Sequence, residues 1–239
     1  MSVERPLSIV ASTKESLVRT AERLIGLHGL DAVSLRQIGQ AAGTTNNSAV
    51  QYHFGTKDRL VQAIFEYRLP QITERRRVLR AQAPTGNLRA VVEAHLRPMV
   101  ELAEGTDSYY MMFLEHLQGY GIAEHPFSRL PPADQASHHE YLRIVGGLLV
   151  DLPPVIRSTR ITQALAICVH ASADRERARH YAAPVLPLAL HVTALFDGII
   201  GFLTAPLSDV TSAALAAGSR RRDRRPLRSG EPPPMEPKG

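Results

Sequence analysis

The chain has 239 residues, of which 44% are hydrophobic and 21% charged, a composition typical of globular proteins with one or two domains. Its one cysteine, Cys168, excludes an internal disulfide and fits a reducing compartment, so we expect a cytoplasmic protein. The first residues contain no apolar core long enough for a signal peptide.

The formal net charge of +5 is unevenly distributed. Residues 67–80 hold five arginines against one glutamate, and residues 219–239 hold seven basic side chains against three acidic ones. Residues 81–218 hold nine basic side chains against thirteen acidic ones. This asymmetry hints at a polyanionic partner, although an ordinary solvated surface explains it equally well.

The N-terminal pattern predicts a long helix followed by a short one. Ser12–Glu15 form a capping box, and apolar residues at helical spacing follow until Gly29. Ser34–Gln37 form a second capping box for a helix that ends at Gly43.

A third short helix is expected within QAAGTTNNSAVQYHFGTKDRL, residues 40–60. Two short capped helices that meet at a glycine form a helix-turn-helix, in which the second helix is displayed at the surface. Thr56 caps a fourth helix, which Pro70 is expected to kink or end.

Polar and apolar side chains separate on the displayed helix at about 100° per residue. Ala49, Val50 and Phe54 lie on its apolar side, where His53 either packs internally or contacts DNA. The polar face carries Asn47, Ser48, Gln51 and Tyr52. These uncharged side chains form hydrogen bonds to base edges or phosphates. The alternative is a helix-turn-helix whose polar residues are merely solvated.

Beyond Pro84 the pattern predicts longer helices separated by proline and glycine. Their expected ranges are 87–104, 108–122, 133–150, 154–179, 188–203 and a short piece at 208–217. No useful length of strand alternation occurs, so the predicted fold class is all-α.

Two remaining stretches need separate interpretations. Val185–Thr204 is long enough for a membrane span, but it contains Pro187, His191 and Asp197. We expect a buried or interface helix there and no membrane partner. After Gly218 the arginine- and proline-rich composition predicts a disordered basic tail, which is either simply solvated or adds nonspecific affinity for DNA.

Four motifs stand in helical register near the N-terminus: Leu35-Arg36-x-Ile38, Ala42-Gly43, Ala49-Val50-x-Tyr52-His53-Phe54 and Phe54-Gly55-x-Lys57-Asp58-x-Leu60. Together they resemble the TetR (tetracycline-repressor) family of bacterial transcription regulators. The resemblance covers residues 12–66. The turn Thr44–Ser48 is one residue longer than in many members.

The resemblance implies that residues 12–66 form a three-helix DNA-binding domain. Its expected DNA-binding residues are Ser34, Arg36, Thr45, Asn46, Asn47, Ser48, Gln51, Tyr52, His53 and Lys57. Asn47 and Gln51 carry amides suited to bidentate contact with adenine. Tyr52 and Lys57 are expected at backbone phosphates, where they add affinity and little specificity.

The resemblance also implies a larger helical ligand-binding and dimerisation domain at residues 67–217, followed by the tail at 218–239. We expect a homodimer formed through the last two long helices, bound to a double-stranded palindromic operator. The expected role is a repressor released by a small ligand; the alternative is an activator or a ligand-independent DNA-binding protein with the same fold.

Small residues support the expected dimer helices. Gly198 and Gly201 lie at helical spacing beside Ala194, and Cys168 lies at helical spacing from alanines on the preceding helix. Small residues in this arrangement let a second helix approach closely. The alternative is packing within one chain.

A pocket for a small hydrophobic or amphipathic ligand needs an apolar lining with a few polar groups. The candidates are Met99, Tyr109, Phe113, His116, Tyr141 and His170. Each of them alone is equally typical of an ordinary core.

No enzyme, cofactor or metal is expected. The chain has no Ser/His/Asp order, glycine-rich phosphate loop or Cys/His metal spacing. His138 and His139 are adjacent, so on a helix their side chains point about 100° apart and chelate poorly.

Overall fold

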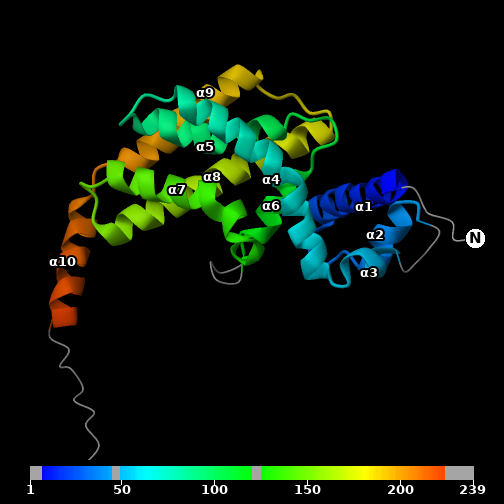
Figure 1. Ribbon diagram of the computed structural model, residues 1–239. Helices are drawn as coiled ribbons and strands as arrows, with labels where there is room; N and C mark the ends of the chain where they lie inside the picture. Colours follow the sequence, from blue (N-terminus) through cyan, green and yellow to red (C-terminus); the bar gives the residue numbers. More distant parts are fainter. Residues whose placement is uncertain (1–6, 45–48, 120–124, 224–239) are drawn as a thin grey trace, which may run out of the picture. The chain divides into compact units, whose positions relative to one another are not determined.

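A computed structural model describes residues 7–44, 49–119 and 125–223, and it contains no strand within these ranges (Figure 1). The all-α prediction is therefore confirmed. The helices are α1 (Leu7–His28), α2 (Leu35–Ala41), α3 (Ala49–Phe54), α4 (Lys57–Gln82), α5 (Leu88–Leu102), α6 (Tyr110–Leu117), η1 (Pro126–Arg129, a 3-10 helix), α7 (Pro132–Leu148), α8 (Pro154–His180), α9 (Leu188–Thr204) and α10 (Asp209–Asp223). The chain divides into two compact units, Met1–Thr204 and Ala205–Gly239.

The first three helices and the start of α4 enclose a small apolar core. Leu17, Ile25, Ile38, Leu60 and Ile64 are fully buried in it. Leu17, Ala21 and Ile25 lie four positions apart in α1, as Leu60 and Ile64 do in α4, so each of these helices turns one apolar face inward.

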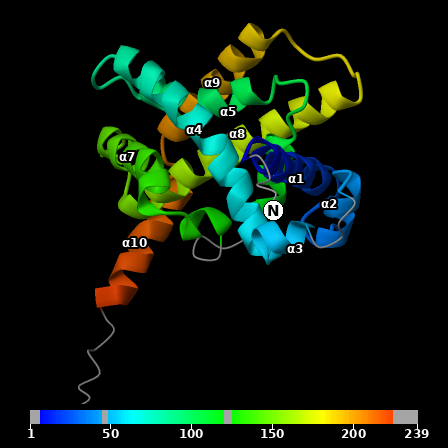
Figure 2. The same ribbon diagram turned by 45° about the vertical axis from the view of Figure 1, so that its right-hand side comes forward.

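Helix α4 joins this region to the rest of the first unit. In both views it runs from the α1–α3 end toward the end that holds α5, α8 and α9 (Figures 1 and 2). Thr56 caps it, as expected, by accepting a hydrogen bond from the backbone N–H of Arg59 at 3.2 Å. The helix continues through Pro70 to Gln82, so it does not end there.

The larger helices extend the same apolar core. Phe65 of α4 lies edge-on against Phe113 of α6 and Phe127 of η1, with ring centroids 5.6 and 5.9 Å apart. Phe196 and Ile199 of α9 are fully buried on the opposite side of α5 and α8. The apolar faces of α4 to α9 thus converge on one interior.

Several predicted boundaries are wrong. Helix α1 begins at Leu7, so Ser12 lies inside it and is not its cap. Helix α6 ends at Leu117, five residues before the expected end. Helix α10 continues to Asp223, six residues beyond the expected end at 217, so the predicted disorder does not hold for 218–223. Residues 224–239 lie outside the described ranges.

The expected domain boundary at residues 66 and 67 falls in the middle of α4. Both expected domains, as far as Thr204, belong to the first compact unit. No single helix in the described ranges is long and apolar enough to cross a membrane.

Candidate nucleic-acid interface

The capping box at the start of α2 forms as the sequence predicts. The Ser34 hydroxyl oxygen accepts a hydrogen bond from the Gln37 N–H at 3.3 Å, and the Gln37 Oε1 accepts one from the Ser34 N–H at 2.8 Å. Two N–H groups that lack partners within the helix are thereby satisfied, and the N-terminal end of α2 is fixed.

The turn between α2 and α3 depends on two glycines. Gly43 has a φ of +70°, a conformation that side chains with a Cβ rarely adopt. Gly39 was missed by the sequence reasoning. A Cβ added there would lie 3.3 Å from Cγ2 of Val50, so the missing side chain lets α3 approach α2 closely. A glycine inside a helical pattern was the available signal.

Helix α3 separates polar from apolar side chains as the helical projection predicts. Val50 is 1% exposed and Phe54 is 8% exposed, whereas Tyr52 is 84% exposed and Gln51 is also exposed. His53 is half-buried, with its ring edge-on to Tyr52 at a centroid distance of 5.3 Å. His53 therefore packs between the exposed Tyr52 and the buried Phe54, whose ring centroid lies 6.2 Å from its own.

The described candidates for DNA contact are mostly accessible. Ser34, Arg36, Gln51 and Tyr52 are exposed, and we call these four the reading face; Lys57 is half-buried beside it. The remaining candidates, Thr45, Asn46, Asn47 and Ser48, lie outside the described residues.

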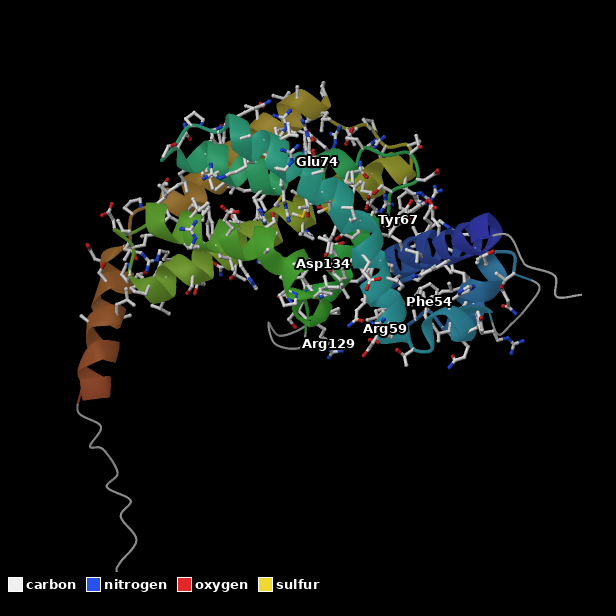
Figure 3. All side chains as sticks on the ribbon, in the orientation of Figure 1. Phe54, Arg59, Tyr67, Glu74, Arg129 and Asp134 are labelled. Carbon is white, nitrogen blue, oxygen red and sulfur yellow. The ribbon has the colours of Figure 1, made fainter. Side chains whose placement is uncertain are left out.

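Two further charged residues lie near this face, and the sequence reasoning did not select them. Arg59 is exposed in the first turn of α4, where its Nη1 donates to Oε1 of Gln62 at 2.7 Å. Arg129 of η1 forms a salt bridge with Asp58 at 3.0 Å. Figure 3 shows Arg59 and Arg129 near the N-terminal end of α4. Their residue type alone gave no signal, because only the fold brings η1 to this end of α4.

The capped α2, the glycine turn and the displayed α3 together form a helix-turn-helix. Residues 17–64 match the family model described as bacterial regulatory proteins, tetR family. Over these residues the chain is similar to the TetR family.

Two solved structures are similar to this chain. One is the superantigen PfiT, with 19% sequence identity and a TM-score of 0.45, covering 82% of this chain and 98% of PfiT. The other is NalD, the secondary repressor of the MexAB-OprM multidrug efflux pump in Pseudomonas aeruginosa, with 18% identity and a TM-score of 0.48, covering 83% of this chain and all of NalD. No curated protein matches significantly.

The residues predicted to line a ligand pocket are spread over several environments. Met99, Phe113 and Tyr141 are buried. The hydroxyl of Tyr109 and Nδ1 of His180 lie 3.2 Å apart, and Nε2 of His116 lies 3.2 Å from the carbonyl oxygen of Gly26. Tyr109 and His116 therefore already have partners of their own, whereas the Tyr141 hydroxyl has none among the described residues.

His170 belongs to a group of charged side chains at the surface. Its Nδ1 lies 2.6 Å from Oε1 of Glu115, and one ligand atom each from Glu115, His170 and Asp174 lie within 4.8 Å of one another. Arg177 forms salt bridges with both carboxylates. These side chains pair with one another, so the geometry is that of an ion-pair network.

Buried carboxylates connect the DNA-binding helices to the larger core. Glu22 of α1 is 1% exposed and forms two hydrogen bonds of 2.6 Å with Arg68 of α4. Its Oε1 also accepts from the N–H of Tyr109 at 3.1 Å. Glu176 of α8 accepts from the N–H of Met112 at 2.9 Å. Two carboxylates from other helices thus cap the start of α6, which has no side-chain cap of its own.

The environment of Glu176 shifts its protonation. Burial raises the pKa of its carboxyl to about 7, and the charge of Glu22 adds to the rise. Its Oε1 has no hydrogen-bond partner among the described residues.

The two helices expected at a dimer interface differ in what they expose. On α8, Cys168 and Ala164 are fully buried within the chain, so the small residues there pack internally. On α9, Gly198 and Gly201 are exposed, and a Cβ added to either would meet nothing within 4 Å. Leu190 of the same helix is 53% exposed. An open face of small and apolar residues is therefore available on α9.

Proposed function

We propose that this protein is a ligand-responsive repressor that binds a palindromic operator as a homodimer. The observation that carries the proposal is the reading face, which holds hydrogen-bonding side chains outward above the buried Val50 and Phe54. Such a face suits hydrogen bonding to base edges and phosphates in a major groove. A helix that served only for packing would not need these exposed hydrogen-bonding side chains.

Selection of bound sequences from a random DNA pool tests this function. We expect a palindrome whose half-sites are separated by about one helical turn, because two protomers related by a two-fold axis present two reading faces. A pool with no enriched sequence, or with a single asymmetric site, would contradict the proposal.

Substitution of Gln51 assigns the binding to α3. Gln51→Ala removes an exposed amide, and we expect about tenfold weaker binding to the selected operator with little change on random DNA. Gln71→Ala is the matched control, because Gln71 is an exposed amide on α4. An equal loss of operator affinity in both variants would show that α3 does not contact the operator.

The open face of α9 is the proposed dimer surface. Gly198→Leu introduces bulk that the single chain accommodates, because nothing lies within 4 Å of the added Cβ. In a closely packed dimer the same side chain separates the helices, so sedimentation equilibrium should show at least about tenfold weaker dimerisation. Gly147→Leu on α7 is the control, as its Cβ also meets nothing within 4 Å.

Ligand control is proposed because one rigid element joins the two regions. Helix α4 begins beside the reading face and carries Phe65 and Arg76 into the larger core. A ligand that binds one position of α4 more tightly than another therefore changes the spacing of the two reading faces. Titration of operator-bound protein with candidate metabolites tests this, and a bound compound that leaves operator affinity unchanged argues against it.

A further inference from the structure

The interior between α4, α5 and α7 contains a buried guanidinium without a carboxylate partner. Arg76 is 9% exposed, and its Nε donates to the carbonyl oxygen of His95 at 2.8 Å. No salt bridge to Arg76 occurs within the described part of the chain. Burial lowers its pKa to about 10, so the side chain remains charged at neutral pH. An unpaired interior charge is costly.

The neighbouring histidines do not neutralise this charge. Nε2 of His95 and Nδ1 of His138 lie 3.3 Å apart, and the positions of both rings are fixed by packing. Burial first, and then the charge of Arg76, lowers the pKa of His138 to about 4 and that of His95 well below its usual range. Both imidazoles are therefore neutral at pH 7.

A second unmatched group lies beside them. Tyr141 is 3% exposed and stacks on His95 with centroids 4.1 Å apart, and its hydroxyl has no hydrogen-bond partner among the residues that the structure describes. His95 joins the two groups, because Arg76 donates to its carbonyl oxygen and the Tyr141 ring stacks on its imidazole. Folded proteins leave few buried polar groups unpaired.

We propose that Arg76 and Tyr141 form the polar end of a binding site for a small aromatic carboxylate. One carboxylate supplies the single negative charge that Arg76 lacks and accepts a hydrogen bond from the Tyr141 hydroxyl. The aromatic ring of the ligand matches the rings of His138 and Phe127, which lie edge-on to each other at 5.6 Å. A phosphate dianion would leave a negative charge unbalanced, and a neutral ligand would leave Arg76 unpaired.

The site specifies the class of ligand for the response proposed above. Only its effect on operator binding rests on the proposed function. The surface hollows along α1, beside Leu24 and His28 and beside Arg19 and Asp107, are separate from it. Benzoate is a small aromatic carboxylate and serves as the probe of the site.

Calorimetric titration of the DNA-free protein with benzoate and benzamide, at constant chloride, tests the site. Benzoate should bind at least about tenfold more tightly than its neutral isostere, because only the anion pairs with Arg76. Arg76→Met should remove this preference. Arg75→Met is the matched control, since Arg75 is a neighbouring arginine that pairs with Glu101 at the surface.

Tyr141→Phe keeps the test decisive if Arg76→Met does not fold. It removes only a hydroxyl that has no partner, so the fold is preserved, and benzoate affinity should fall about threefold to tenfold. Equal binding of benzoate and benzamide, no binding of benzoate, or unchanged benzoate affinity in Tyr141→Phe would overturn the inference. Operator binding does not enter this measurement, so failure of the site and failure of the proposed repressor function are distinguishable.

Discussion

The DNA-binding helices and the larger helical core distribute polarity in opposite ways. Helix α3 exposes Gln51 and Tyr52 and keeps a purely apolar floor, whereas the larger core buries Arg76, Glu176 and the Glu22–Arg68 pair. Exposed polar groups keep their water until a partner displaces it, while buried ones must find partners inside the fold. The first region thus keeps its polar groups in water, and the second depends on its internal charges.

The largest expected effect is at the buried ion pair. Glu22→Ala leaves the Arg68 guanidinium and the Tyr109 N–H without their shared acceptor, so we expect a loss of about 3–5 kcal/mol in the free energy of unfolding. Urea denaturation measures it. Glu15→Ala, at an exposed position of the same helix, should change stability by less than about 0.5 kcal/mol. Equal losses would mean that burial does not distinguish the two carboxylates.

Glu176 should make stability depend on pH near neutrality. Its pKa in the folded state, about 7, lies above the ordinary value of 4.5, so the folded state holds the proton more strongly. Its contribution to the free energy of unfolding is fully present below pH 4.5. About 3 kcal/mol of that contribution is lost as the pH rises through 7. Glu176→Gln should flatten this part of the pH profile. The exposed Glu140→Gln should leave the profile as steep as in the natural chain, and a flattening there would refute the assignment.

On the buried apolar side of α3, even a single added hydroxyl should lower the free energy of unfolding. Val50→Thr conserves shape but places a polar group at a position that is 1% exposed, so we expect a loss of about 2 kcal/mol in the free energy of unfolding. The same substitution at Val155, which is 58% exposed, should cost less than about 0.5 kcal/mol. Thermal denaturation of the two variants makes the comparison, and similar midpoints would show that the floor is looser than the structure indicates.

The smallest expected effect is at the cap of α2. Ser34→Ala removes an acceptor for the Gln37 N–H and should cost about 1 kcal/mol. Ser34→Asp retains the cap and adds a negative charge, so it should preserve stability while weakening operator binding at low salt. Fluorescence anisotropy with labelled operator measures the second effect. If Ser34→Asp leaves the operator affinity unchanged, Ser34 does not contact a phosphate.

The sequence allowed the helix-turn-helix to be predicted because its signals are local. The Ser34 cap, the Gly43 turn and the apolar positions of Val50 and Phe54 each depend on neighbours within one or two turns of helix. The larger core offered fewer such signals. The polar ligand candidates were selected by residue type, and the structure gives several of them separate partners.

The sequence by itself determined the helical class and the polar face of α3, because capping and helical periodicity are properties of adjacent residues. Only the tertiary structure decided that Arg68 has a carboxylate partner while Arg76 has none among the described residues, and that Glu22 and Glu176 cap α6 from two other helices. Residues far apart in the chain make these contacts. Their partners are set by how long helices pack against one another, which no local pattern specifies.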